Sequence, residues 1–269
     1  MEKAVKGALI AAGAAFIFIM LILPLATVIV YAFRQGLETF WQAVSEPYTL
    51  KALQLTLLTT VIALIVNTVF GIAASWAITR YHFKGRGLLT TLIDIPFSIS
   101  PVIAGLTFIL VFGRIGWAYP FLQAHDIKIV FAVPGIVLAT IFVTFPFVSR
   151  EMIPLMQSRG TDEEEAAALM GASWFTIYRK ITFPHIKWSL LYGIILCTAR
   201  AMGEFGAVSV VSGHLRGKTN TLPLHVEILF NEFHLTQAFA VSGILVVIAV
   251  IVLIVRNIVE YKLEKGDER

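Results

Sequence analysis

Cysteine and charged side chains are both scarce in this sequence. Cys197 is the only cysteine, so the chain can form no internal disulfide and offers no cysteine-based metal site. Because Cys197 lies in an apolar run, we expect it to be a small packing residue. Only 14% of the residues are charged, whereas a soluble domain carries about 25%. The six histidines are scattered singly, and no catalytic triad or nucleic-acid signature is present, which argues against an enzyme, a metal site and a nucleic-acid-binding protein.

Apolar residues make up 58% of the chain and gather in long runs. A helix needs roughly 20 mostly apolar residues to cross the hydrocarbon core of a membrane. Six stretches meet this requirement: 8–33, 52–79, 88–112, 129–149, 189–212 and 238–255. They lack the two-residue alternation of barrel strands, so we expect helices. The sequence therefore predicts an all-α, polytopic membrane protein with six transmembrane helices in a single domain, residues 1–269.

Two details of these stretches carry further expectations. The first stretch follows Lys3 and Lys6, as a secretory signal does, but its apolar part exceeds the roughly 7–15 residues of a signal core, so we interpret it as a retained span. Because proline blocks regular helix, we expect kinks at Pro24, Pro96, Pro101, Pro134 and Pro146. We also expect Gly71, Gly203 and Gly206 to let helices pack closely.

The distribution of lysine and arginine predicts the orientation, because cytoplasmic loops carry an excess of both. One set of alternate segments holds fourteen of them: Lys3, Lys6, Arg80, Lys84, Arg86, Arg150, Arg159, Arg179, Lys180, Lys187, Arg256, Lys262, Lys265 and Arg269. The other set holds six: Arg34, Lys51, Arg114, Lys128, Arg216 and Lys218. This asymmetry predicts that both termini are cytoplasmic, which agrees with an even number of spans.

The longest loop on the predicted cytoplasmic side, residues 150–188, has the pattern of two short helices. Thr161 and Glu164 have the spacing of a capping box at the start of the first helix. Gly171 is positioned to end that helix in a left-handed conformation. Ser173 is positioned to cap a second short helix, which we expect Pro184 to close. The pair would present a small-residue surface that another protein can approach.

The stretch from Glu165 to Pro184 resembles the EAA loop of ABC-importer permeases. That motif reads Glu-Ala-Ala, three residues, Gly, nine residues, Ile, one residue, Leu-Pro. The matching residues are Glu165, Ala166, Ala167, Gly171, Ile181 and Pro184, and Phe183 stands where Leu is usual. The resemblance implies that this loop is a coupling helix seated in a groove of an ATPase subunit, and that these six residues form the ATPase-coupling site.

A second resemblance narrows the family. The run 199–207 is similar to the sulfate/thiosulfate and molybdate branch of these permeases, and the runs 212–217 and 219–227 most resemble W-type sulfate permeases. The resemblance covers essentially the whole chain and implies a type I, MetI-like permease fold. It also implies a heterodimer with a T-type permease, two copies of an ATPase subunit and an external sulfate-binding protein. A molybdate or tungstate permease, which would be a homodimer, is the alternative.

Charged residues inside the predicted spans are expensive in lipid and usually face a bundle interior or a wet cavity. Arg200 and Glu204 are four residues apart and therefore share a helix face. They form either a self-neutralising structural pair, or an anion pathway in which Arg200 supplies positive potential and Glu204 holds it in place. Asp94, beside Pro96, either caps a broken helix or pairs with a partner subunit.

Residues 213–219, Gly-His-Leu-Arg-Gly-Lys-Thr, approach the pattern of a phosphate-binding P-loop. That motif needs four residues between its glycines, and here there are three. The segment also lies on the predicted external side, away from ATP, so we reject a nucleotide site. Arg216 and Lys218 either contact the binding protein and guide an anion, or belong to a plain solvated turn.

These observations predict the pore-forming permease subunit of an ATP-driven importer, which moves sulfate or thiosulfate across a bacterial inner membrane into the cytoplasm. The chain itself is expected to catalyse no reaction and to need no cofactor, because the partner subunits hydrolyse ATP. A secondary anion transporter driven by an ion gradient is the rival of another class. That class commonly shows internal repeats, which this sequence lacks, and has no use for the pattern from Glu165 to Gly171.

Overall fold

The computed structural model of this chain describes the backbone of residues 2–267 and the side chains of residues 5–261. Within that part the regular structure is helical and contains no strand, as the sequence predicts. Several residues of the charge count lie outside the described residues, namely Arg269 and the side chains of Lys3, Lys262 and Lys265.

The first half of the chain contains α1 (Glu2–Ile17), the π-helix η1 (Phe18–Ile22), α2 (Leu23–Ala32), α3 (Leu37–Ser45), α4 (Pro47–Arg80), α5 (Arg86–Ser98), α6 (Pro101–Phe112) and α7 (Tyr119–Ala124). The second half contains α8 (Val133–Thr144), α9 (Pro146–Arg159), α10 (Asp162–Leu169), α11 (Trp174–Ile177), the π-helix η2 (Tyr178–Thr182), α12 (Phe183–Met202), α13 (Gly206–Ser212), α14 (Leu222–Asn231) and α15 (Leu235–Asp267).

Six membrane spans are reached by counting four long helical stretches and two bent pairs. The four are Val5–Ala32, Pro47–Arg80, Val133–Arg159 and Leu235–Tyr261. The pairs are α5 with α6, bent by 108°, and Trp174–Met202 with α13, bent by 49°. The kink expected at Pro101 is therefore a sharp bend, which divides the predicted span 88–112 into α5 and α6. Ser100 is extended because the ring of Pro101 disfavours helical backbone at the preceding residue, and α6 leaves at a new angle.

The fourth span is longer than the sequence predicted. Its helical stretch continues to Arg159, so Arg150 lies within the span and not in the loop that follows. Pro24 and Pro146 each follow a local irregularity within a long helical stretch: η1 ends directly before α2, and the turn residue Phe145 separates α8 from α9. Pro134 stands in the first turn of α8, where proline fits because its missing N–H has no intrahelical acceptor.

The core lies where α4, α8, α9, α12 and α13 meet. A Cβ added to Gly71 on α4 would come within 2.6 Å of Val148 Cγ1 on α9, and one added to Gly206 would come within 3.0 Å of Pro101 Cβ, so both glycines allow the expected close packing. Gly203 does not, because a Cβ added there would have only the carbonyl oxygen of Ala199, on the preceding helix turn, within 4 Å, at 3.7 Å. Cys197 is fully buried, in agreement with a packing role.

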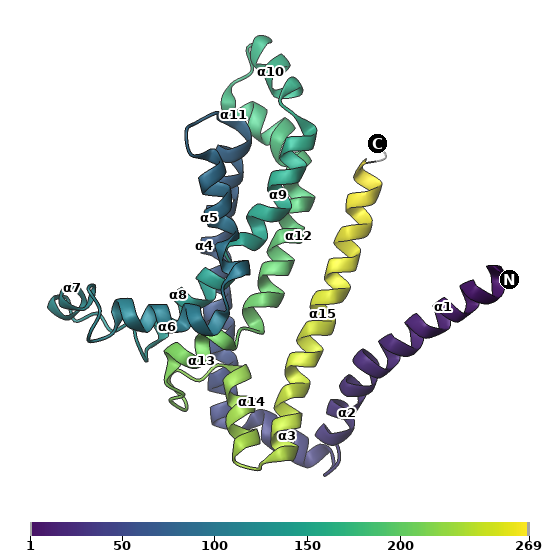
Figure 1. Cartoon of the computed structure of the whole chain (residues 1–269), viewed down its shortest axis with the longest axis vertical. Coiled ribbons are helices and arrows are strands. Elements are labelled where there is room, and N and C mark those ends of the chain that lie inside the picture. Colours follow the sequence, from purple (N-terminus) through teal and green to yellow (C-terminus); the bar gives the residue numbers. More distant parts are fainter. Residues whose placement is uncertain (1, 268–269) are drawn as a thin grey trace.

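The features that the sequence singled out lie at different ends of the molecule (Figure 1). The α10–α11 pair and the C-terminal end of α15 point to the upper end of the view, whereas α3 and α14 lie at the lower end. Helix α1 diverges from the bundle, and the apolar window of its span is 0% buried. The coupling loop and the turn that carries Arg216 therefore lie at opposite ends of the bundle.

Candidate functional site

The first loop helix, α10, has the limits that the sequence predicted. Its first turn contains four acidic residues, Asp162 to Glu165, which the positive end of the helix dipole favours. Gly171 ends it with φ of +83°. The N–H of Gly171 donates to the carbonyl of Ala168 at 3.0 Å, and the N–H of Ala172 to that of Ala167 at 3.0 Å. This pair of bonds is a Schellman cap, which satisfies the last carbonyls of the helix.

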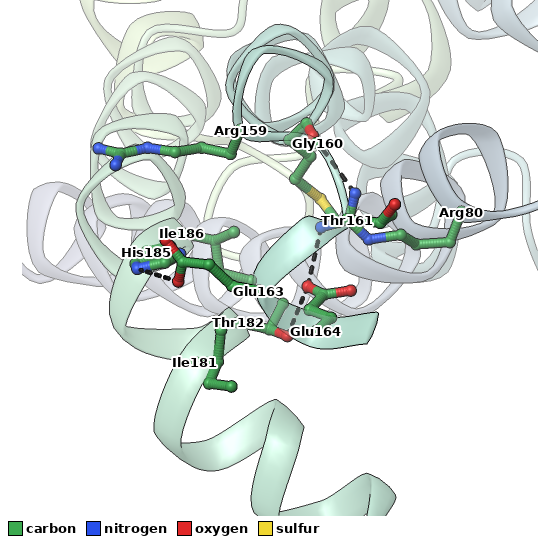
Figure 2. Close-up of a pocket in the computed structure, with 11 residues that line it drawn as sticks. Arg80, Arg159, Gly160, Thr161, Glu163, Glu164, Ile181, Thr182, His185 and Ile186 are labelled. Carbon is green, nitrogen blue, oxygen red and sulfur yellow. Dashed lines mark hydrogen bonds and ion pairs between the residues drawn. The ribbon is translucent and has the colours of Figure 1, made fainter. Parts of the chain in front are cut away.

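The predicted capping box between Thr161 and Glu164 is wrong. Thr161 makes no side-chain cap bond and instead donates to Glu165 Oε1 at 2.6 Å. Glu164 turns away from the helix end, because Arg80 and Thr182 offer it partners: Arg80 Nη2 lies 2.8 Å from Glu164 Oε1, and Thr182 Oγ1 donates to the same oxygen at 2.7 Å. Figure 2 shows these side chains converging from three helices.

The second loop helix begins as expected but does not end at Pro184. Ser173 Oγ accepts a bond from the N–H of Thr176 and so caps α11. The helix then continues through η2 into α12, and Pro184 stands in the first turn of α12. A π-helical turn widens the backbone just before the proline, which relieves the clash that a proline ring makes with the carbonyl four residues earlier. The second loop helix is thus continuous with the fifth span.

The tip of the loop presents large apolar side chains to the outside. Leu169 is 91% exposed and Met170 82%, and Trp174 and Phe175 are also exposed. Exposed apolar side chains gathered at one end of a molecule mark a surface that another protein covers. The six residues predicted to couple to an ATPase lie at or near this tip: Glu165, Ala166 and Gly171 are exposed, Ala167 is buried, and Ile181 and Pro184 are half-buried.

Arg200 and Glu204 form the predicted ion pair, with Arg200 Nη1 2.6 Å from Glu204 Oε2. Glu204 lies in the break between α12 and α13, and its other oxygen accepts a bond from the N–H of Ala207 at 2.8 Å. The Glu204 side chain is 1% exposed and that of Arg200 is 33% exposed. Glu204 therefore holds two segments of a broken span together, while one edge of Arg200 reaches the surface of the chain.

Asp94 has its partner within this chain. Arg150 Nε lies 3.4 Å from Asp94 Oδ1, and the guanidinium stacks over the ring of Phe97 at 4.5 Å. Both charged side chains are about half exposed. The pair joins α5 to α9, so the alternative in which Asp94 caps a broken helix is not what the structure has.

The turn between α13 and α14, predicted to be external, is held by ion pairs and is not a P-loop. Arg216 forms an ion pair with Glu232, and His214 Nε2 lies 3.2 Å from Glu227 Oε2. Lys218 is exposed. The turn connects α13 to α14 with no preceding strand among the described residues, as the rejection of a nucleotide site requires. Nowhere among these described residues do three His, Cys, Asp or Glu side chains gather as a metal site.

Residues 219–222, next to this turn, are buried against α4. Thr219 donates to the carbonyl of Ser212 at 2.7 Å, and the N–H of Leu222 donates to Thr56 Oγ1 at 2.8 Å. His225, 1% exposed, has Nε2 at 3.1 Å from Thr49 Oγ1 and Nδ1 at 3.3 Å from Asn220 Nδ2. Burial lowers the pKa of His225, and the nearby Glu46 carboxylate partly opposes this shift.

Sequence reasoning missed Arg80 and Thr182. Arg80 entered only as one cation of a cytoplasmic loop, and Thr182 fell in an unassigned position of the EAA pattern. Nothing local marks either residue, because their partner Glu164 is 84 residues from Arg80 and 18 from Thr182.

Broken apolar spans, ion pairs between helices and a loop with an exposed apolar tip are the features of a polytopic membrane protein that binds a partner at one end. The family described as "Binding-protein-dependent transport system inner membrane component" matches residues 67–265, and this chain belongs to that family.

Several relatives are similar over most of their length. The chain is 46% identical to the sulfate transport system permease protein CysW of Escherichia coli, over 93% of this chain and 86% of the relative. It is 48% identical to the CysW protein of Synechococcus elongatus, over 94% of this chain and 88% of the relative. It is 34% identical to the sulfate transport system permease protein CysT of Salmonella typhimurium, over 88% and 86%.

Solved structures confirm the fold. A chain of a bacterial alginate ABC transporter, crystallised with an alginate pentasaccharide-bound periplasmic protein, superposes with a TM-score of 0.79 at 17% identity, over 95% of this chain and 93% of that one. A chain of the MetNI methionine ABC transporter in inward-facing conformations gives 0.57 at 16% identity, over 84% and 98%. The MetI-like permease fold implied by the EAA resemblance is therefore correct.

Proposed function

We propose that this chain is the permease subunit of an ABC importer that moves sulfate or thiosulfate across the inner membrane into the cytoplasm. The observation that carries the proposal is the loop from Asp162 to Pro184. It combines a capped short helix, a left-handed Gly171 and an exposed apolar tip with a continuous helical connection to a membrane span. The similarity to sulfate permeases along nearly the whole chain supports the choice of substrate.

The partners follow from the same arrangement. The exposed tip at Leu169 and Met170 is the docking surface for an ATPase subunit, and two copies of that subunit serve two permease chains. The second permease is a T-type subunit, since this chain is also related to proteins of that name. A periplasmic sulfate-binding protein docks at the opposite end of the bundle, where Arg216 and Lys218 lie beside α14. The coupling residues are Glu165, Ala166, Ala167, Gly171, Ile181 and Pro184, all within the segment 150–188 of a single domain 1–269, a segment that also contains the end of α9 and the start of α12.

The orientation completes the proposal. Both termini and the α10–α11 pair face the cytoplasm, as the excess of lysine and arginine on those segments favours. ATP-driven closure of the ATPase subunits displaces α10 and rocks the attached spans between outward- and inward-facing states. Dehydrated sulfate crosses a low-dielectric passage, where a single positive group has a large effect on a dianion.

Co-expression with a T-type permease and an ATPase subunit tests this function. We expect the three proteins to co-purify and the reconstituted complex to take up radiolabelled sulfate when ATP and the sulfate-binding protein are supplied. Uptake of molybdate but not sulfate by a complex that contains two copies of this chain would overturn the substrate and the heterodimer. Uptake driven by an ion gradient without an ATPase subunit would overturn the class of transporter.

A further inference from the structure

Glu164 ties the coupling helix to two membrane spans through a single carboxylate. Its Oε1 receives Arg80 Nη2 at 2.8 Å and Thr182 Oγ1 at 2.7 Å (Figure 2). Arg80 is in the last turn of α4, and Thr182 is the last residue of η2, which leads into α12. The side chains of Arg80 and Glu164 are only 10% and 16% exposed, so water screens this ion pair weakly.

Arg80 extends the joint to a third span. Its Nη1 donates to the carbonyl of Met156 near the end of α9 at 3.4 Å, and its guanidinium lies 5.8 Å from the centre of the Trp76 ring. The cavity that Arg80, Glu164 and Thr182 help to line measures about 20 Å³, which is space for about one water molecule. The arrangement is therefore a packed joint between helices and not a ligand site.

The covalent connections of α10 are poorly suited to transmit a displacement. Gly160, with φ of +67°, precedes the helix, and Gly171, with φ of +83°, follows it. Glycine has the widest backbone freedom of any residue, so turns at both ends of α10 can absorb a movement of the helix. The neighbouring contact between His185 Nε2 and Glu163 Oε2, at 3.5 Å, is also weak, because the Glu163 side chain is 69% exposed. Glu164, in contrast, bypasses both turns.

We propose that Arg80, Glu164 and Thr182 form the joint through which displacement of the coupling helix moves the ends of α4 and α12 together. This inference rests on the proposed function, in which the ATPase subunits displace α10. The three side chains are positioning residues: they contact neither ATP nor the transported anion, and they convert movement of a short helix into movement of two spans.

If Arg80, Glu164 and Thr182 form this joint, replacing any one of them should weaken the coupling between ATP hydrolysis and transport. The ATPase should still dock, because the apolar tip that it contacts is unaltered. Glu164→Gln keeps the shape of the side chain and an oxygen for Thr182, but it removes the charge that holds Arg80. Arg80→Met removes the guanidinium and retains an apolar stem beside Trp76. Thr182→Val removes one hydroxyl and leaves the ion pair. Glu163→Gln, one residue away and exposed, is the matched control.

The readout is the ratio of sulfate taken up to ATP hydrolysed, measured on the same proteoliposomes with the T-type subunit, the ATPase and the sulfate-loaded binding protein. We expect Arg80→Met and Glu164→Gln to lower this ratio roughly tenfold, within the ~5–150-fold range of coupling between distant sites. The double variant should be no worse than the worse single variant, Thr182→Val should give a smaller loss, and Glu163→Gln should match the wild type.

Three outcomes would overturn the inference. The first is an unchanged ratio in assembled Arg80→Met and Glu164→Gln complexes, and the second is an equal loss in Glu163→Gln. The third is loss of the ATPase subunits from all three joint variants, Thr182→Val included, which would make the residues a folding element and not a transmission joint. Failure of the proposed function looks different, since the wild-type complex itself would then lack ATP-driven sulfate uptake.

Discussion

Replacing Arg200 and Glu204 separately and together tests how the chain holds charge inside the membrane. Arg200→Met removes the guanidinium 2.6 Å from Glu204 Oε2 and leaves a carboxylate that is 1% exposed. Removing one partner of a buried ion pair costs about 3–5 kcal/mol of folding free energy. The remaining bond from the N–H of Ala207 stabilises the carboxylate only in part, so we expect a loss near the lower end of that range.

Glu204→Gln should cost less. The glutamine oxygen can still accept the bond from the N–H of Ala207, which caps α13, and Arg200 is 33% exposed and can keep contact with the surface of the chain. We expect a loss of about 1.5–3 kcal/mol, the usual contribution of a hydrogen bond to a charged group. The double variant leaves neither charge unpaired, so it should be more stable than Arg200→Met alone, with a coupling of at least about 2 kcal/mol.

The assays are thermal unfolding of the purified complex in detergent and sulfate uptake normalised to assembled complex. If the pair is structural, the double variant recovers both stability and much of the uptake. If Arg200 supplies positive potential to the anion pathway, the double variant recovers stability but still fails to move sulfate. An Arg200→Met variant that assembles and transports like the wild type would refute both readings and leave Arg200 as a residue that snorkels to the membrane interface.

Three further predictions concern Gly171 in the loop, the membrane topology and the buried His225. Gly171→Leu should insert normally but lower binding-protein-stimulated ATP hydrolysis and uptake, because a side chain at φ of +83° costs about 1–2 kcal/mol. Full stimulation in a well-expressed variant would exclude docking by this loop. Cysteines introduced at Lys84 and Glu163 should react with impermeant reagents only from the cytoplasm, and one at Lys218 only from outside; labelling of positions 84 and 218 from one face would make the span count wrong. Because burial lowers the pKa of His225, the unfolded chain binds more protons than the folded one, so stability that is complete above about pH 6.5 should fall as the pH drops further. His225→Asn should flatten this pH dependence of the unfolding temperature, and an unchanged profile would contradict the assignment.

Sequence predicted the parts of the loop that local chemistry determines. Acidic residues at a helix start and glycine at its end act within one turn, so Asp162–Leu169 and the left-handed Gly171 follow from their neighbours alone. The hydrogen-bond partners of Glu164 do not follow from its neighbours in the sequence. Its carboxylate can reach both a local amide and a distant guanidinium, and the tertiary structure determines which of them it binds. The ion pair between Arg200 and Glu204 was predictable since its members are four residues apart.

In the bends of the spans, too, the sequence indicates the position and the tertiary packing determines the geometry. Proline at position 101 marked a change of direction, but the angle of 108° depends on where α6 packs. A Cβ added to Gly105 would lie 2.7 Å from the carbonyl oxygen of Ala207, so α6 rests directly on the backbone of α13. Pro184 was predicted to end a helix but does not, because a π-turn directly before it lets the helix continue. A proline indicates where a helix can change, and packing decides what the change is.

The run 219–227, which resembles W-type sulfate permeases, begins with three buried residues. Thr219, Asn220 and Thr221 are each 3% exposed, and the bonds of this segment go to Ser212, His225 and Thr56. Thr219 Oγ1 and Asn220 Nδ2 are bonded inside the protein, whereas Asn220 Oδ1 and Thr221 Oγ1 are buried without a partner. All three side chains are buried in this conformation, and the bond from the N–H of Leu222 to Thr56 ties the start of α14 to α4. Two cations within the helical stretches counted as spans, Arg150 and Arg200, are each paired with a carboxylate and each partly exposed.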